Sequence, residues 1–130
     1  MKILFICKYN RFRSKVAEAF FNKLNKNKKN TAQSAGLIIE KHVHKNVLAL
    51  EKLYNIKINK TPHSVTESVL ENSDILIIAA DNVPRQLFKN KAKKIIVWKI
   101  PDTTQDNKKR IKEIADQIKN KVSKFVKQLK

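Results

Sequence analysis

Residues 3–20 read ILFICKYNRFRSKVAEAF, and this stretch decides the fold. An apolar run that ends at Ile6 is followed by polar residues and then by apolar residues at helical spacing, among them Val16 and Phe20. The sequence therefore predicts a buried strand over residues 2–6, a loop and a helix. Cys7, the only cysteine of the chain, stands where the strand gives way to the loop.

The rest of the chain alternates short apolar segments with amphipathic ones. Strands are expected over residues 31–36, 74–80 and 95–98, and the second of these is apolar on both faces, as a central parallel strand must be. Helices are expected over 46–54 (with Val47, Leu50 and Leu53 aligned), after Pro62 with Ser64 as the N-cap, over 84–88, and from about Asp106 onward. This alternation predicts an α/β fold of one domain over residues 1–130. It is a three-layer sandwich with a central four-stranded parallel sheet, about five flanking helices and a phosphate-binding loop after the first strand.

The composition fits a soluble globular protein, with 42% hydrophobic and 31% charged residues among 130. One cysteine, no signal-peptide core and no apolar run of the ~20 residues that span a bilayer indicate a cytoplasmic protein. The net charge of +18 favours anionic partners such as phosphate esters, nucleic acid or acidic proteins. The excess of lysine is diffuse, and no nucleic-acid-binding motif accompanies it.

The place of Cys7 between a strand and a helix favours a nucleophilic role. The thiolate is the nucleophilic form, and a helix N-terminus with an arginine nearby lowers a cysteine pKa to ~3.5–7.5. Arg13 follows Cys7 by six positions, and the five residues between them can curl so that their backbone N–H groups surround an anion. Ligands of parallel sheets bind at the carboxyl ends of strands, where Cys7 is expected. These residues predict a thiolate beneath a bound phosphate.

Three residues of the loop region fit the same chemistry. Arg13 can hold two phosphate oxygens with its planar guanidinium, whereas a lysine acts only as a point charge. Ser14 can hydrogen-bond the sulfur and so favour the thiolate as resting state and leaving group. Asn10 tolerates a left-handed turn where glycine is absent, and its side chain can tie the loop internally.

The loop and three later segments resemble the low-molecular-weight protein tyrosine phosphatase family, whose fold is shared with thioredoxin-coupled arsenate reductases. The resemblance runs over residues 3–7 and 13–19, Ser34-Ala35-Gly36, Val65-Thr66 with the run from Asp74, and Trp98-Lys99-Ile100-Pro101-Asp102. These segments cover most of the chain in order. The resemblance implies a cysteine-dependent phosphatase that hydrolyses phosphomonoesters, protein phosphotyrosine foremost.

The resemblance also implies roles for single residues. Cys7 attacks phosphorus to form a cysteinyl-phosphate, Arg13 and the loop amides hold the transferring oxygens, and Asp102 protonates the leaving oxygen and then activates water. Asn10, Ser14 and Ser34 support the loop. The phosphate-binding loop comprises Lys8, Tyr9, Asn10, Arg11, Phe12 and Arg13. No cofactor, metal or membrane is expected, and the expected partner is a phosphorylated protein or a small phosphate ester.

Some loop residues depart from the family pattern. Tyr9 stands where many members have glycine, and Phe12 replaces the second loop cysteine of many relatives. Without that second cysteine, an oxidised Cys7 has no resolving partner within the chain. Thr103-Thr104 stand where the family has proline and aromatic residues, which weakens the expectation that phosphotyrosine is the substrate.

Two more polar residues lie near the expected site. His63 could belong to a hydrogen-bond network behind the loop, but it is expected to be a surface histidine. Asp106 competes with Asp102 as the acid, but its position favours capping of the final helix.

Three other functions stay open at this level. An arsenate reductase would need further cysteines to carry a disulfide away from Cys7, so this chain could serve only with an external thiol. A basic nucleic-acid-binding module would account for the charge but not for Cys7, Arg13, Ser14 and Asp102 together. A phosphate-sensing relative without catalysis is the third.

Overall fold

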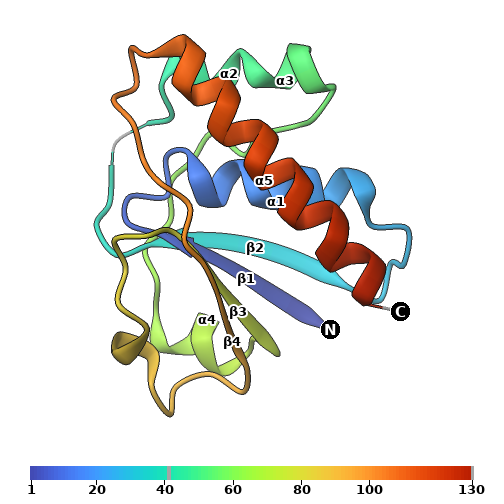
Figure 1. Cartoon of the computed structure of the whole chain (residues 1–130). Helices are drawn as coiled ribbons and strands as arrows, with labels where there is room; N and C mark the ends of the chain where they lie inside the picture. Colours follow the sequence, from blue (N-terminus) through green and yellow to red (C-terminus); the bar gives the residue numbers. More distant parts are fainter. Residues whose placement is uncertain (41, 130) are drawn as a thin grey trace.

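A four-stranded parallel sheet forms the centre of the protein (Figure 1). The computed structural model describes residues 1–40 and 42–129. The strands lie in the order β2-β1-β3-β4. Their bounds are Lys2–Cys7 for β1, Thr31–Gly36 for β2, Ile75–Ala79 for β3 and Ile95–Trp98 for β4. The four expected strands are confirmed, and β1 continues one residue further than predicted, through Cys7.

Helices cover both faces of this sheet, so the predicted three-layer architecture is confirmed. Figure 1 shows α1 and α5 on one face and α4 on the other. The helices are α1 (Arg13–Leu24), α2 (Lys45–Leu48), α3 (Leu50–Tyr54), α4 (Glu67–Glu71), the 3-10 helix η1 (Arg85–Phe88) and α5 (Lys108–Gln128).

Alternate residues of the strands feed two separate cores, because successive side chains of a strand point to opposite faces. Ile3 and Phe5 of β1 pack in the core beneath α1 and α5. Leu4 and Ile6 pack in the core that includes Leu70 of α4. The apolar stripe predicted for the final helix lies in the first core, with Ile111, Ile114, Ala115, Ile118, Val122 and Phe125 buried.

Two helices begin later than their predicted caps. Ser64 does not cap a helix, because its segment is extended and bridges Gly36 at the end of β2. Thr66 caps α4 instead, and its hydroxyl accepts a hydrogen bond from Val69 N. Asp106 does not cap α5, since Asn107 accepts from Arg110 N in that role.

The helix predicted over 46–54 is interrupted. Ala49 ends α2 and precedes α3, so two short helices replace a continuous one. Val47 and Leu50 are buried as predicted, but Leu53 is 57% exposed and leaves the apolar face. The helix predicted over 84–88 is a single 3-10 turn, η1.

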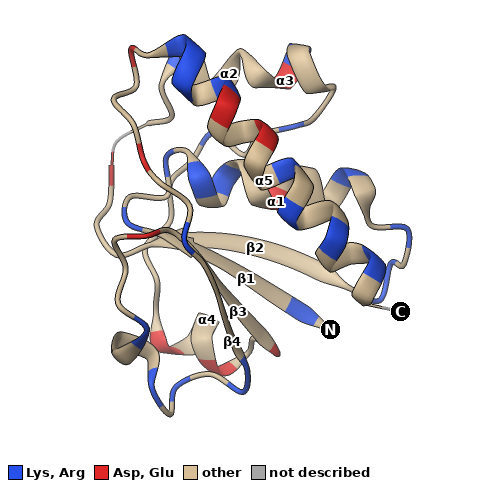
Figure 2. Ribbon diagram, in the orientation of Figure 1, with Lys and Arg blue, Asp and Glu red and all other residues tan. Residues whose placement is uncertain are grey.

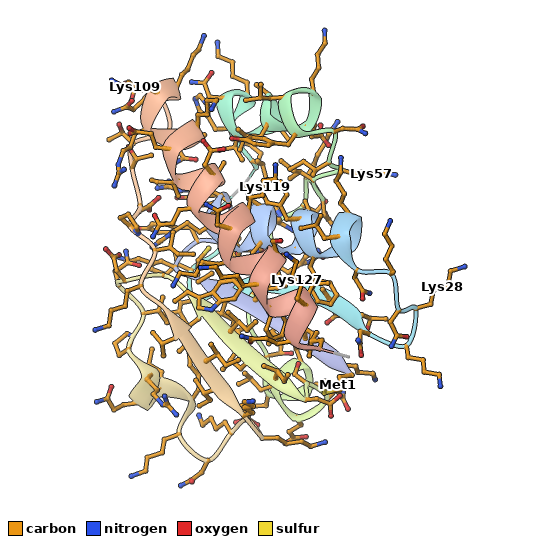
Figure 3. The ribbon with its side chains drawn as sticks, turned by 45° about the vertical axis from the view of Figure 1, so that its right-hand side comes forward. Met1, Lys28, Lys57, Lys109, Lys119 and Lys127 are labelled. Atoms are coloured by element: carbon orange, nitrogen blue, oxygen red, sulfur yellow. The ribbon has the colours of Figure 1, made fainter. Side chains whose placement is uncertain are left out.

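Basic side chains are spread over the whole molecule, as the sequence indicated. Figure 2 shows lysine and arginine on α1 and α5 and on the loops, whereas α4 carries only acidic charges. In Figure 3, Lys109, Lys119 and Lys127 extend outward from α5, opposite its buried stripe. None of the helices that the structure describes has the length and apolar character needed to cross a bilayer.

The strand order places a topological switch point at the carboxyl end of β1. The chain leaves β1 for β2 on one side, and β3 then pairs with the other side of β1. Helical connections on either side of such a switch point diverge, and ligands of open parallel sheets bind there. Cys7, the last residue of β1, lies at this point.

Candidate active site

Residues 8–12 form the loop between β1 and α1, and Asn10 determines the direction of its backbone. The φ angle of Asn10 is 53°, the left-handed conformation that was predicted for it. Its side chain is fully buried, and both polar atoms of its amide form hydrogen bonds. Nδ2 donates to Ser14 Oγ at 2.7 Å, and Oδ1 accepts from the backbone N of His63 at 2.8 Å. Asn10 therefore ties the loop to α1 and to the connector before α4.

Ser14 contacts the sulfur of Cys7 through two atoms. Its Oγ lies 2.9 Å from Sγ, and its backbone N donates to Sγ at 3.4 Å. Because Oγ already accepts from Asn10, its own proton is free to point at the sulfur, and a thiolate can only accept it. The arrangement stabilises negative charge on Cys7, which is 2% exposed.

The backbone N–H groups of the loop are left open. None of those of residues 8–12 donates to a protein acceptor in the described part of the chain. Phe12, at the N-cap position of α1, offers no side-chain cap, and the first turn of α1 has no acidic residue. Consecutive free N–H groups at a helix N-terminus bind anions, so this loop can hold a phosphate above Cys7.

Gly36, the only glycine of the chain, allows the loop to lie against the end of β2. Its N donates to His63 O and its O accepts from Val65 N, so the connector is paired there as well. A Cβ at position 36 would lie 2.7 Å from both Asn10 N and Tyr9 C. Both atoms are backbone, so the loop itself would have to move.

We expect Gly36→Ala to lower the free energy of unfolding by about 1–3 kcal/mol, the usual cost of forcing a side chain into a packed site. It should also reduce turnover, because the displaced atoms belong to the anion-binding loop. Urea unfolding and steady-state kinetics measure the two effects. Gln33→Ala, at an exposed position of the same strand, is the control. Wild-type stability and turnover in Gly36→Ala would contradict the close approach.

Arg13 opens α1, and its side chain is buried at the rim of the site. Nη1 donates to Ile100 O at 2.9 Å, and Nη2 donates to Asn82 Oδ1 at 3.0 Å. Nη1 also lies 3.5 Å from Asp81 Oδ1. Arg13 thus joins the segments after β3 and β4 to the loop, and these contacts leave part of its donor set free for an oxyanion.

Asp102 lies four residues after β4 and reaches the loop, as predicted. Its Oδ2 is 3.6 Å from a guanidinium nitrogen of Arg13 and 3.6 Å from one of Arg11. Its Oδ1 accepts from Thr103 N at 2.9 Å, which orients the carboxyl group. The side chain is 23% exposed, so it can meet both water and a ligand.

The remaining loop side chains have different surroundings. Arg11 stacks on Tyr9, with its guanidinium carbon 4.4 Å from the ring centroid, and pairs with Glu40 at 3.2 Å. Lys8 also lies over the Tyr9 ring, at 5.3 Å. Phe12 is buried in the core beneath α1, so only its backbone can serve the anion site. The mouth of the site therefore carries paired charges and a single aromatic ring from the loop.

Ser34 and His63 have other contacts than a loop-supporting role would require. Ser34 Oγ donates to Glu18 Oε1 at 2.6 Å, and no hydrogen bond joins it to residues 7–14 within the described chain. His63 has an exposed side chain, as predicted for a surface histidine, but its backbone N donates a hydrogen bond to Asn10 Oδ1. The support of the loop thus comes from Asn10, Ser14 and the backbone of the connector.

Three polar residues near the loop were missed from the sequence. Asp81 and Asn82, which contact Arg13, follow β3 at its carboxyl end, and the rule that located Asp102 after β4 would also have found them. Lys15 is 1% exposed on α1, and its Nζ donates to Thr61 O at 2.6 Å. Its burial lowers the pKa of Lys15, while the charges of Glu18 and Cys7 act in the opposite direction. The sequence carried no signal for Lys15 beyond its place beside Ser14.

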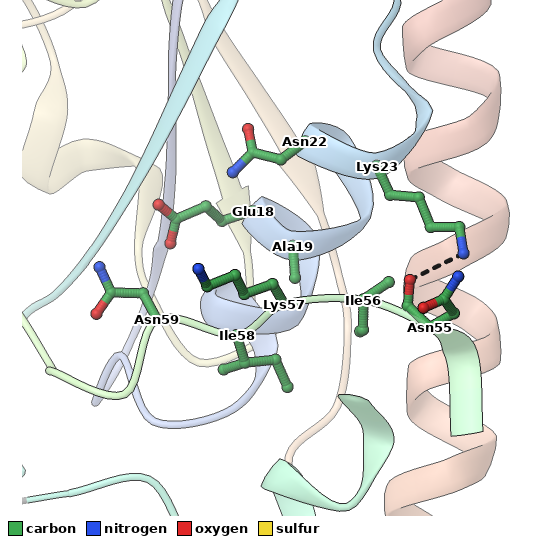
Figure 4. A pocket seen from close by; sticks show the side chains of 9 residues that line it. All are labelled: Glu18, Ala19, Asn22, Lys23, Asn55, Ile56, Lys57, Ile58 and Asn59. Atoms are coloured by element: carbon green, nitrogen blue, oxygen red, sulfur yellow. Dashed lines mark hydrogen bonds between the residues drawn. The ribbon is translucent and has the colours of Figure 1, made fainter. Parts of the chain in front are cut away.

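Pocket volume alone would point to another part of the surface. A pocket of about 540 Å³ lies between α1 and residues 55–59, lined by Glu18 and Lys57 among others, and does not include the loop (Figure 4). A pocket of about 370 Å³ adjoins the loop through Arg11, with Ile39, Glu40, His42, His44 and Gln105. We place the site at Cys7 because the nucleophile, the open loop N–H groups, Arg13 and Asp102 lie together there.

Comparison with known proteins gives one family. The model described as low molecular weight phosphotyrosine protein phosphatase matches residues 2–130. No curated protein matches the chain.

Solved structures of several enzymes share the fold. A low molecular weight protein tyrosine phosphatase from T. tengcongensis is 25% identical, with a TM-score of 0.87 over 99% of each chain. An arsenate reductase from Archaeoglobus fulgidus is 26% identical, with a TM-score of 0.79 over 95% of this chain and 98% of that one. The arginine phosphatase YwlE from Geobacillus stearothermophilus is 14% identical, with a TM-score of 0.86 over 98% and 92%, and this similarity concerns the fold alone.

Proposed function

The chain belongs to the low molecular weight phosphotyrosine protein phosphatase family, and we propose that it hydrolyses phosphomonoesters through a cysteinyl-phosphate intermediate. The observation that carries the proposal is the sulfur of Cys7, hydrogen-bonded by Ser14 beneath a loop whose five N–H groups lack protein acceptors among the described residues. Asp102 stands at the same rim.

The proposed reaction has two steps with balanced proton transfers. The Cys7 thiolate attacks phosphorus, an S–P bond forms, and the P–O bond to the leaving group breaks as Asp102 gives its proton to that oxygen. Asp102 then takes a proton from water, which attacks phosphorus and breaks the S–P bond. Arg13 and the loop amides hold the three transferring oxygens, and Ser14 stabilises the departing thiolate.

We propose protein phosphotyrosine as the substrate class, with phosphoarginine and small phosphate esters as the competing classes. The family supports phosphotyrosine. The Thr103-Thr104 pair after Asp102, which adds no aromatic ring to the site, supports a less specific substrate.

We expect the protein to hydrolyse p-nitrophenyl phosphate and phosphotyrosine peptides, with inorganic phosphate as a competitive inhibitor because it occupies the same loop. The measurement is kcat/KM across a panel of phosphotyrosine peptide, phosphoarginine peptide and small esters. Arsenate with added thiols is a further arm, since Cys7 is the only cysteine and would need an external resolving thiol.

Two outcomes would contradict the proposal. The first is that the protein binds phosphate but releases phosphate from no substrate of the panel. The protein would then be a phosphate-binding protein without catalysis. Arsenate reduction with thiols that far exceeds hydrolysis of every ester would assign the site to reductase chemistry.

A further inference from the structure

Lys15 is a buried lysine of α1 whose ammonium group contacts the connector before α4. Lysine is almost never fully buried in proteins unless it is paired, and this side chain is 1% exposed. It follows Ser14 on α1 and donates to Thr61 O at 2.6 Å. A methyl-terminated side chain would fill the same space without the free-energy cost of burying a charge. We therefore look for a function of the charge other than filling space.

A short series of contacts connects Lys15 with the sulfur. Lys15 holds Thr61, two residues before His63, whose backbone N donates to Asn10 Oδ1 at 2.8 Å. The amide of Asn10 donates to Ser14 Oγ, which lies 2.9 Å from Cys7 Sγ. The connector therefore reaches the nucleophile through Asn10, and Lys15 anchors that connector to the helix that carries Ser14.

The charged groups around Lys15 include the nucleophile itself. The charged groups that face it are Glu18 on its own helix and Cys7 at the end of β1, and the exposed His63 belongs to the connector packed beside it. Both Cys7 and Glu18 favour the ammonium form, opposing the effect of burial on the Lys15 pKa.

We propose that Lys15 is a positioning residue of the active site, whose ammonium anchors the 61–63 connector behind Asn10 and so holds Asn10 and Ser14 in place against the Cys7 sulfur. The inference rests on the proposed function in taking the thiolate as the reactive form. It assigns to this chain a charged group behind the loop, in addition to Arg13 at the rim.

Lys15→Met tests the proposal, because methionine matches the length of the lysine stem without the charge. The first measurement is the rate of Cys7 alkylation by iodoacetamide across pH 4–9, followed by mass spectrometry, which needs no turnover. We expect the half-maximal rate to move about one pH unit upward, so that alkylation slows about tenfold at acidic pH. The acid limb of kcat/KM for p-nitrophenyl phosphate should move in the same direction.

Lys23→Met is the matched control. Lys23 lies on the same helix and donates to Tyr54 O and Asn55 O, but it is exposed and remote from the loop (Figure 4). We expect its alkylation profile to match wild type. The thermal midpoint of Lys15→Met is measured beside the profile, because the variant loses both a buried charge and the hydrogen bond to Thr61 O.

Coincident alkylation profiles for wild type, Lys15→Met and Lys23→Met would overturn the proposal, as would a Lys15→Met protein that is less stable with an unchanged profile. Failure of the proposed function is distinguishable from these results. In that case wild type hydrolyses no phosphate ester, while alkylation of Cys7 still depends on Lys15.

Discussion

Cys7→Ser is expected to lower kcat for p-nitrophenyl phosphate by ~10⁴-fold or more, because a serine hydroxyl remains protonated at neutral pH and is a poor nucleophile. The fold should be retained, since serine is smaller than cysteine and Ser14 still offers its hydroxyl and backbone N at this position. The free loop amides should still bind phosphate. The measurements are initial rates, phosphate affinity by calorimetry and the thermal midpoint.

A trapping experiment complements the loss of turnover. Rapid acid quench of wild type during turnover should reveal a phosphate adduct on Cys7 by mass spectrometry, absent from Cys7→Ser. Ser34→Ala is the control, because Ser34 bonds Glu18 rather than the loop, and it should keep most of the wild-type rate. Hydrolysis that persists in Cys7→Ser at the wild-type rate would remove the cysteine from the mechanism.

The sheet was predictable because its signals are local and strong. The strands have apolar runs bounded by polar residues, and β3 is buried along its whole length. Parallel strands with helical connections place their carboxyl ends at one edge, which located both Cys7 and Asp102. The helix starts were less predictable, because several residues near each start could serve as a cap.

Tertiary pairing decided between those caps. Ser64 has the right residue type three positions before Glu67, but its backbone lies beside Gly36 in an extended conformation and cannot start a helix. Thr66, two residues further, is the first residue free of that pairing. No local pattern reports this bridge, since it joins the end of β2 to a segment far along the chain.

Site residues were predictable where the chemistry requires a particular residue type. They were unpredictable where only tertiary packing determines whether a side chain is buried. The left-handed turn at Asn10 and the contact of Ser14 with the sulfur followed from residue type and position. The burial of Lys15 did not, because a lysine beside a polar loop is ordinarily solvated. Ser34 was assigned to the loop by resemblance alone, and its hydroxyl instead bonds Glu18.

Asp102→Asn is expected to lower kcat by ~10²–10⁴-fold, the usual contribution of a general acid–base group. Asparagine preserves the shape of the side chain and can still accept from Thr103 N, but it cannot give a proton to the leaving oxygen. The loss should grow as the leaving group becomes more basic, since a poor leaving group needs the proton most. A series of aryl phosphates with different phenol pKa values measures this dependence.

Asp81→Asn is the matched control for that variant. Asp81 lies 3.5 Å from Nη1 of Arg13, comparable with the 3.6 Å between Asp102 and Arg13, so both substitutions remove one negative charge beside the same guanidinium. If Asp102 is the proton donor, only Asp102→Asn should steepen the dependence on the leaving group, whereas a purely electrostatic effect on Arg13 would appear in both variants. A steeper dependence in Asp81→Asn alone would move the acid to the segment after β3. Equal losses without any change of slope would leave both carboxylates as anchors of Arg13.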